Sequence, residues 1–318
     1  MPALRHRLRL AFAAALVAQW APAPGIEFVF DYTYDSLGFF AGANTNRRDT
    51  LEAAGSFFET YLADDLLTLD ATNSGNPANT WAARFTDPSD GVTLRSLTNL
   101  VVTSDTLTVF VGARDLPGGA LGQGGPGGFF ASGTASWLET VRARGETGAL
   151  GPVTNDCGPW GGALSFDTGV NWYFDSDVAT IETFPGTNDF YSVALHELAH
   201  LLGFGTAQSF NRLLSGLSFT GSSSVAEYGG EVPMYNTSHW LTNAVSSLYG
   251  GVGTQEVAMD PDLLVGTRKY FTELDVAGLA DAGWEFLIPE PPCLAMAAAL
   301  LAILALRRRG RPRHPAAT

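Results

Sequence analysis

The sequence is poor in cysteine and in charged residues. It has only two cysteines and 16% charged residues in 318 positions, which excludes a disulfide scaffold, a coiled coil and a disordered chain. Basic residues are the scarcer kind, with 18 Lys and Arg against 32 Asp and Glu. The resulting net charge of −14 argues against nucleic acid or an anionic membrane surface as a partner. The 46% of hydrophobic residues is enough for a globular core.

The few basic residues are concentrated at the two ends of the chain. Eight of the 18 lie within residues 1–25 and 289–318, which leaves 10 basic residues against 31 acidic ones between those segments. The ends therefore differ in kind from the middle, and we treat them as separate segments.

Residues 1–25 have the layout of a secretory signal peptide. A basic start precedes an apolar run from Leu10 to Ala18, followed by small residues and prolines. The apolar run is too short to span a bilayer. We expect export followed by cleavage between about Ala18 and Gly25, and the alternative is a buried N-terminal helix.

The other end, residues 289–318, resembles a PEP-CTERM sorting tail. Pro289-Glu290-Pro291 is followed by an apolar run from Leu294 to Leu306 and then by Arg307, Arg308 and Arg309. The resemblance implies a Gram-negative exporter, an exosortase-type enzyme that processes the tail, and delivery to the cell envelope, the surface or an extracellular matrix. Membrane association is then transient, or C-terminal if the tail is kept as an anchor.

Between the two ends, residues 26–288 are predicted to form one α+β domain. Aromatic and β-branched residues predict strands, and apolar residues at helical spacing predict helices. The predicted strands are 28–40, 80–86, 97–113 and 161–174, and the predicted helices are 46–66, 135–144, 187–202 and 272–283. We expect Asn46 to cap the first helix, Thr187 or Asn188 to cap the third, and Thr272 with Asp275 to form a capping box on the last.

The glycine-rich segment 117–128 is predicted to be a flexible surface loop. It contains Gly122-x-Gly124-x-x-Gly127, which has the form of a dinucleotide-binding fingerprint. Pro126 interrupts the fingerprint and no helix pattern follows it, so we reject that function.

His196-Glu197-Leu198-Ala199-His200 is an H-E-x-x-H motif. Positions i and i+4 share one face of a helix, so both imidazoles can bind one metal ion. Glu197 lies off that line, where its carboxylate can reach a water molecule without binding the metal. Zinc suits such nitrogen ligands, and it lowers the pKa of a bound water towards about 7 so that the carboxylate can take the proton.

A catalytic zinc site needs a third protein ligand. His6 and His314 lie in the two end segments, so His239 is the one histidine left to join His196 and His200. The alternatives are Glu227 and Glu231, either of which would complete a site of two histidines and one carboxylate.

These residues resemble the metzincin zinc peptidases. The segment HELAHLLGFG (196–205) carries the metzincin glycine as Gly203, but Thr206 stands where the compact pattern has its third histidine. In the leishmanolysin-like branch that histidine follows a long insertion in a Ser-His-Trp setting, and a Met-turn comes after it. Ser238-His239-Trp240 and the Met259 segment, VAMDP, match that order.

The resemblance implies a mixed sheet with an active-site helix and a C-terminal helix. It assigns His196, His200 and His239 as zinc ligands, Gly203 as the turn after the helix and Met259 as an apolar floor under the metal. It also implies that the strand at 161–174 is an edge strand that pairs with extended substrate.

Two further features remain open at this stage. Tyr249 and Tyr270 are candidates for an additional oxyanion stabiliser by position alone. Asp167, Asp175 and Asp177 offer oxygen ligands for calcium, but they lack an EF-hand pattern, which favours a solvated acidic surface.

The sequence therefore predicts an exported zinc-dependent metalloendopeptidase that acts on proteins or peptides through a zinc-bound water activated by Glu197. One alternative is a non-catalytic zinc-binding protein of the cell surface or an exopolysaccharide matrix. Another is a zinc hydrolase acting on a non-peptide bond in such a matrix, although no pair of carboxylates marks a glycosidase.

Overall fold

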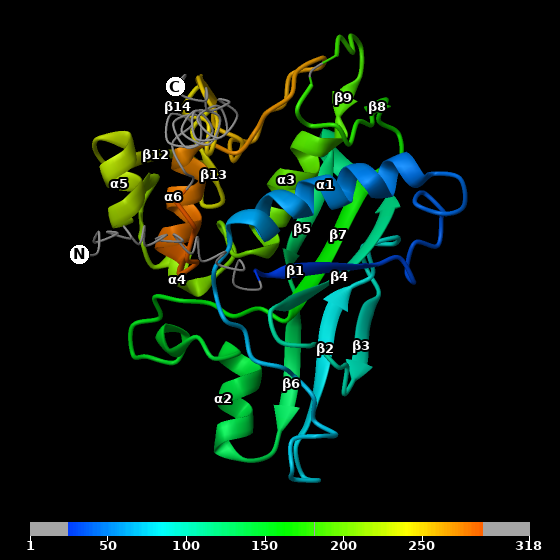
Figure 1. Cartoon of the computed structure of the whole chain (residues 1–318), viewed down its shortest axis with the longest axis vertical. Coiled ribbons are helices and arrows are strands. Elements are labelled where there is room, and N and C mark those ends of the chain that lie inside the picture. The colour runs from blue at the N-terminus through cyan, green and yellow to red at the C-terminus, as the bar shows by residue number, and fades with distance from the viewer. Residues whose placement is uncertain (1–24, 181, 289–318) are drawn as a thin grey trace, which may run out of the picture.

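The computed structural model describes residues 25–180 and 182–288 (Figure 1). The predicted sorting tail and all of the predicted signal peptide except Gly25 lie outside the described residues. Among the helices that are described, none combines the length and the apolar character needed to cross a membrane.

A mixed four-stranded sheet forms the centre of the molecule, and its strands run in the order β1-β4-β7-β5. They are β1 (Glu27–Asp31), β4 (Thr106–Arg114), β7 (Gly161–Asp167) and β5 (Gly122–Pro126). The first three are parallel, and β5 is antiparallel to β7 at the edge. Together with the helices, these mixed sheets confirm the predicted α+β class.

Two helices pack on one face of the central sheet, α1 (Thr45–Tyr61) and α3 (Phe190–Leu201). Figure 1 shows α1 crossing in front of the strands. Their buried side chains join inward-facing residues of β4 and β7 in the main core. Because α3 is buried on nearly every side, its sequence is almost entirely apolar apart from the motif residues.

A second, antiparallel sheet and a helix cover the other face of the central sheet. The sheet runs in the order β3-β2-β6 and packs through stacked Phe85 and Phe110, whose ring centroids are 4.2 Å apart. Its members are β2 (Thr80–Thr86), β3 (Leu94–Thr98) and β6 (Gly128–Ser132), with α2 (Ala135–Ala143) beside β6. Arg144 ends α2 in the left-handed conformation and is fully buried.

Most of the remaining elements follow α3 in the chain. The helices among them are α4 (Gln208–Asn211), α5 (Ser222–Tyr228) and α6 (Glu273–Ala282). Two short strands, β8 (Trp172–Tyr173) and β9 (Asn188–Asp189), precede α3. The strands that follow α3 are β10 (Leu214–Ser215), β11 (Ser218–Phe219), β12 (Val232–Asn236), β13 (His239–Trp240), β14 (Val245–Ser247) and β15 (Thr254–Glu256). Two 3-10 turns, η1 (Pro117–Gly119) and η2 (Thr147–Ala149), complete the list. The predicted capping box of Thr272 and Asp275 on α6 is confirmed.

The largest error of the sequence prediction concerns the glycine-rich segment. Residues 117–128 are not a flexible loop, because Gly122–Pro126 forms β5 and pairs along its length with β7. The prediction that the strand at 161–174 lies at the edge of the sheet is wrong for the same reason. β7 lies inside the sheet between β4 and β5, so β5 is the edge strand beside α3.

Smaller errors concern the ends of elements. The strand predicted at 28–40 ends at Asp31, and the one at 97–113 is split where Asn99 and Asp105 adopt positive φ angles of 52° and 56°. Helix α1 is preceded by Asn44 rather than capped by Asn46. Helix α3 is capped by Asp189, whose side chain accepts a hydrogen bond from the Ser192 N–H.

Candidate metal centre

Helix α3 supplies two histidines on one face, as the spacing of the motif predicts. His200 is buried and His196 is partly exposed at the surface of the core. The helix ends at Leu201, and Gly203 then turns the chain with φ of +112°. A Cβ at Gly203 would lie 2.7 Å from that of Ala207, so this turn requires glycine.

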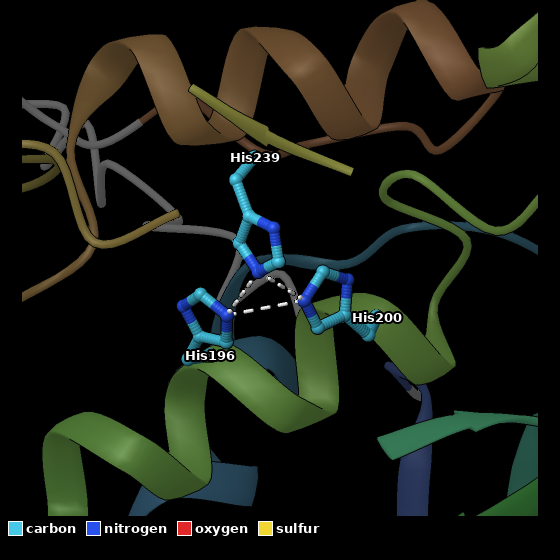
Figure 2. A group of neighbouring side chains, drawn as sticks. All are labelled: His196, His200 and His239. Carbon is cyan, nitrogen blue, oxygen red and sulfur yellow. Dashed lines mark hydrogen bonds between the residues drawn. The ribbon is translucent and has the colours of Figure 1, made fainter. Parts of the chain in front are cut away.

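The third histidine comes from the short strand β13. Figure 2 shows His239 pointing from β13 towards the two histidines of α3. The Nε2 atom of His196 lies 3.1 Å from the Nε2 atoms of both His200 and His239. The Nε2 atoms of His200 and His239 are 3.2 Å apart. Three imidazoles from two segments thus converge on one point, as a group that could hold a metal ion.

The other ring nitrogen of each histidine is held by an oxygen acceptor. The Nδ1 of His196 lies 2.8 Å from the Ala258 carbonyl oxygen, and that of His200 lies 2.8 Å from the Phe204 carbonyl oxygen. The Nδ1 of His239 lies 3.0 Å from Asn236 Oδ1. These acceptors place the proton on Nδ1, so each Nε2 directs a lone pair towards the shared point.

The electrostatics keep the three rings in the neutral form that a metal needs. Burial, followed by the neighbouring His200 and His239, lowers the pKa of His196 well below its ordinary value. Burial also lowers the pKa of His200, and burial with His200 lowers that of His239 to about 4. At neutral pH the lone pairs are therefore free for coordination.

The geometry fits a tetrahedral metal bound through nitrogen. A four-coordinate zinc with bonds of about 2.0–2.1 Å requires nitrogens about 3.3–3.4 Å apart, close to the observed 3.1–3.2 Å. The alternative ligands are not part of this group. Glu227 accepts a hydrogen bond from the Ser246 hydroxyl, and Glu231 is exposed to solvent.

Glu197 lies beneath the edge strand β5. Its side chain is enclosed, and the residue is only 6% exposed. Burial raises the pKa of Glu197 to about 8, and a hydrogen bond from the Gly124 backbone partly opposes this rise. A Cβ at Gly122 would lie 2.6 Å from Glu197 Cγ, and one at Gly124 would overlap the Glu197 carbonyl oxygen. The glycines that mimic a nucleotide fingerprint therefore let β5 approach the helix that carries the motif.

The turn at Ala258 and Met259 connects α6 to two of the histidines. The Asp275 carboxylate accepts the N–H of Ala258 at 2.9 Å and that of Met259 at 3.1 Å. The Ala258 carbonyl holds His196, and the Met259 carbonyl accepts the N–H of Trp240, the residue after His239. Met259 itself is fully buried in the main core.

A close approach of two loops also positions His239. Gly205 has a φ of +70°, and a Cβ there would lie 2.5 Å from the Cα of Ser238. The Ser238 hydroxyl in turn donates to the Gly205 carbonyl at 3.3 Å. Sequence reasoning missed this contact, the role of Asn236, and the hydrogen bonds from Ala258 and Met259 to Asp275, because all three depend on tertiary structure.

Several candidates from the sequence lie in other environments. The Tyr249 hydroxyl donates to the Leu287 carbonyl, and the Tyr270 hydroxyl donates to the Val178 carbonyl. The three aspartates considered as calcium ligands each have other partners. Asp167 accepts backbone N–H groups, Asp175 pairs with Arg268, and Asp177 accepts the Ala179 N–H. They form no metal-binding group among the described residues.

A cavity of about 250 Å³ opens beside the histidines. It reaches from the segment before β5 to the turn that follows Met259, and Glu197, His196 and His239 lie in its wall. A reacting group held there would contact both the metal centre and the carboxylate.

Comparison of the chain with models of known protein families and with curated proteins finds no match to either.

Proposed function

We propose that this chain is an exported zinc-dependent metalloendopeptidase. The observation that carries the proposal is the convergence of three histidine Nε2 atoms, all within 3.2 Å of one another, beside the buried carboxylate of Glu197. Nitrogen ligands in this number suit zinc, and a neighbouring carboxylate suits hydrolysis. The resemblance to metzincins supports a zinc peptidase. The sequences of the two end segments support export and processing of the tail.

Each residue then has a defined task. When bound, zinc supplies a Lewis acid that polarises a carbonyl group and makes water more acidic. Glu197 accepts the proton of the attacking water at a carboxylate oxygen and delivers it to the leaving amine. A dication held by the three histidines would oppose the burial that raises the pKa of Glu197 and would favour the carboxylate form that accepts a proton. The Gly124 N–H keeps the carboxylate in place during this transfer.

The substrate is expected to bind as an extended peptide along the edge of the central sheet. β5 is that edge, because it pairs with β7 on one side and with no other strand of the central sheet. Backbone pairing of this kind holds a peptide bond in a fixed position without regard to most side chains.

The test compares zinc content and casein digestion in the purified chain and three variants. We expect Glu197→Gln to keep its zinc and to lose at least about 100-fold in rate, because it removes the general base. His239→Ala should lose zinc as well as activity, whereas Glu231→Gln should change neither. Full zinc content in His239→Ala would overturn the ligand assignment.

A second candidate is a non-catalytic zinc-binding protein of the cell surface or matrix. The observation that favours it is the close cover of Glu197 by β5. Stoichiometric zinc without digestion of any protein or peptide by the unmodified chain would decide for this candidate.

A further inference from the structure

A second cavity, of about 240 Å³, lies on the face of β5 that points away from Glu197. Side chains at positions 122 and 124 of this strand would face Glu197, and both positions are glycine. Because side chains alternate along a strand, Gln123 between them points to the other face. There Gln123 lines the cavity together with Ser165, its partner on β7. The cavity therefore adjoins the same edge strand along which the substrate is expected to bind.

Arg114, at the end of β4, places its guanidinium group in the wall of this cavity, which we call the Arg114 cavity. Among the described residues it forms no ion pair. Its Nη2 donates to the side-chain oxygen of Gln123, and its Nη1 donates to the Asp115 carbonyl oxygen at 3.4 Å. Each Nη carries two N–H groups, so each retains one for a further acceptor. Nε is buried while the residue is partly exposed, so a ligand would reach Arg114 through these two terminal nitrogens.

The guanidinium group of Arg114 is held in position before any ligand binds. On one side it lies against the backbone of Gly91, which has a φ of +69°. A Cβ at Gly91 would lie 2.6 Å from both Cζ and Nε of Arg114, so this contact requires glycine. On the other side Gln123 accepts its Nη2. A group that is already oriented loses little freedom on binding, which favours a specific contact.

The nearby carboxylates do not neutralise Arg114. Asp87 is the carboxylate in the cavity wall, and its Oδ2 accepts Nε and Nη2 of Arg95 at 2.8 and 2.6 Å. Its Oδ1 accepts a backbone N–H at 2.8 Å. Asp90 and Asp115 are exposed to solvent, and their residues are not part of the wall. The Asp87 pair thus balances its own charge and leaves Arg114 as the unpaired charge of the cavity.

On the basis of the proposed peptidase function, we propose that the Arg114 cavity binds an acidic side chain of the substrate, glutamate or aspartate. A peptide that pairs with β5 places alternate side chains on the two faces of the sheet. Those on one face meet Glu197 and the metal centre, and those between them meet the Arg114 cavity. A carboxylate there accepts charge-assisted hydrogen bonds from the terminal nitrogens of Arg114, and a basic side chain is repelled.

The first experiment measures binding without cleavage. Hexapeptides with blocked ends carry one glutamate, or one glutamine of the same shape, and no other charged residue. Their binding to the Glu197→Gln chain is measured by calorimetry at about pH 7, where glutamate is ionised. Salt at about 0.15 M screens the acidic surface of the protein. We expect the glutamate peptide to bind at least about 10-fold more tightly than the glutamine peptide. Equal binding of the two overturns the proposal.

A pair of charge variants assigns the preference to Arg114. Arg114→Gln should reduce the preference for glutamate to less than about 3-fold, because it removes the charge that the carboxylate meets. Arg212→Gln removes the same charge at an exposed position outside the cavity wall, and it should keep the full preference. Equal losses in the two variants would point to the net charge of the protein and overturn the assignment.

A pair of glycine variants moves the guanidinium group and leaves every charge in place. Gly91→Ala pushes Arg114 out of its position, so it should also reduce the preference to less than about 3-fold. Gly75→Ala is the matched control, because Gly75 has a φ of +74° and an added Cβ meets nothing within 4 Å. Urea unfolding checks that both variants are folded. An undiminished preference in folded Gly91→Ala would overturn the role of the fixed guanidinium group.

Cleavage by the unmodified chain then separates the two proposals, because a cut bond fixes the register of the peptide on β5. Mass spectrometry of digested casein should find acidic residues enriched at alternate positions beside the cut bonds and not at two neighbouring ones. If glutamate peptides bind preferentially through Arg114 and no peptide is cut, the peptidase function fails while the binding proposal stands. If peptides are cut with no preference for acidic residues, the binding proposal fails while the peptidase function stands.

Discussion

The carboxylate of Asp275 accepts the backbone N–H of Ala258 at 2.9 Å, and the carbonyl of the same Ala258 holds the Nδ1 of His196 at 2.8 Å. One residue, Ala258, thus connects helix α6 to a ligand on helix α3. The position of the ligand depends on a carboxylate that lies far away in the sequence. Partners of this kind fix the orientation and tautomer of a metal-binding histidine.

We expect Asp275→Asn to weaken zinc binding by about 10- to 100-fold, because its amide group would face backbone N–H donors. The same change should lower the free energy of unfolding in the presence of chelator by about 2 kcal/mol. Competition with a zinc chelator and urea unfolding measure the two effects. Glu273→Gln, on the same turn of α6, is the control, and equal zinc affinity in both variants would contradict the role of Asp275.

A methyl group at Gly205 should disturb His239 through Ser238. Gly205→Ala should lower the free energy of unfolding by about 1 kcal/mol, because an alanine is strained at this positive φ. The added Cβ would also push the Ser238 backbone, whose Cα would lie 2.5 Å away. We expect about a 10-fold loss of zinc affinity. Gly216→Ala is the matched control, because Gly216 has a φ of +64° and an added Cβ meets nothing within 4 Å. The prediction is wrong if both variants bind zinc alike.

The edge strand offers a test of how Glu197 is placed. Gly122→Ala brings a Cβ to 2.6 Å from Glu197 Cγ, so it should displace the carboxylate and slow casein digestion by about 10- to 100-fold. Zinc content should stay the same. In the same strand, Gly125 has open space around it, and Gly125→Ala should leave the rate unchanged. Equal rates in the two variants would show that Glu197 tolerates the displacement.

Asp64 should make stability depend on pH. Burial raises the pKa of Asp64 to about 7, above the ordinary value of an unfolded chain. Its contribution to stability is therefore full below about pH 4 and is lost as the pH rises through 7. At pH 8 we expect Asp64→Asn to be more stable than the unmodified chain by about 2 kcal/mol, with the difference vanishing at pH 4.

Urea unfolding across this range, with the exposed neighbour Asp65→Asn as control, measures the effect of Asp64. A constant difference between Asp64→Asn and the unmodified chain from pH 4 to pH 8 would exclude the proposed titration.

The sequence predicts those features of the site that local spacing determines. The pair His196 and His200 is set four residues apart on an apolar helix, and the capping box on α6 is equally local. The choice between His239 and the two glutamates stayed open, because it depends on how the chain returns after residue 205. Only the tertiary structure shows Gly205 against Ser238.

The error at the glycine-rich strand has a physical cause. A strand is recognised from β-branched and aromatic side chains, and β5 has none. Its glycines are required because the strand lies against Glu197 and Leu164, and nothing in the nearby sequence records those contacts. The expectation that 161–174 forms the edge failed with it, since β7 becomes an inner strand once β5 is added.

The three ligands are attached to elements of very different rigidity. Two sit on the deeply buried helix α3, whereas His239 sits on a two-residue strand that pairs with the partly exposed β12. Hydrogen exchange should therefore be slow in α3 and fast around residues 236–240. Metal release would then begin with His239 leaving first, so the lifetime of the bound ion would be set by local opening of that hairpin rather than by unfolding of the protein.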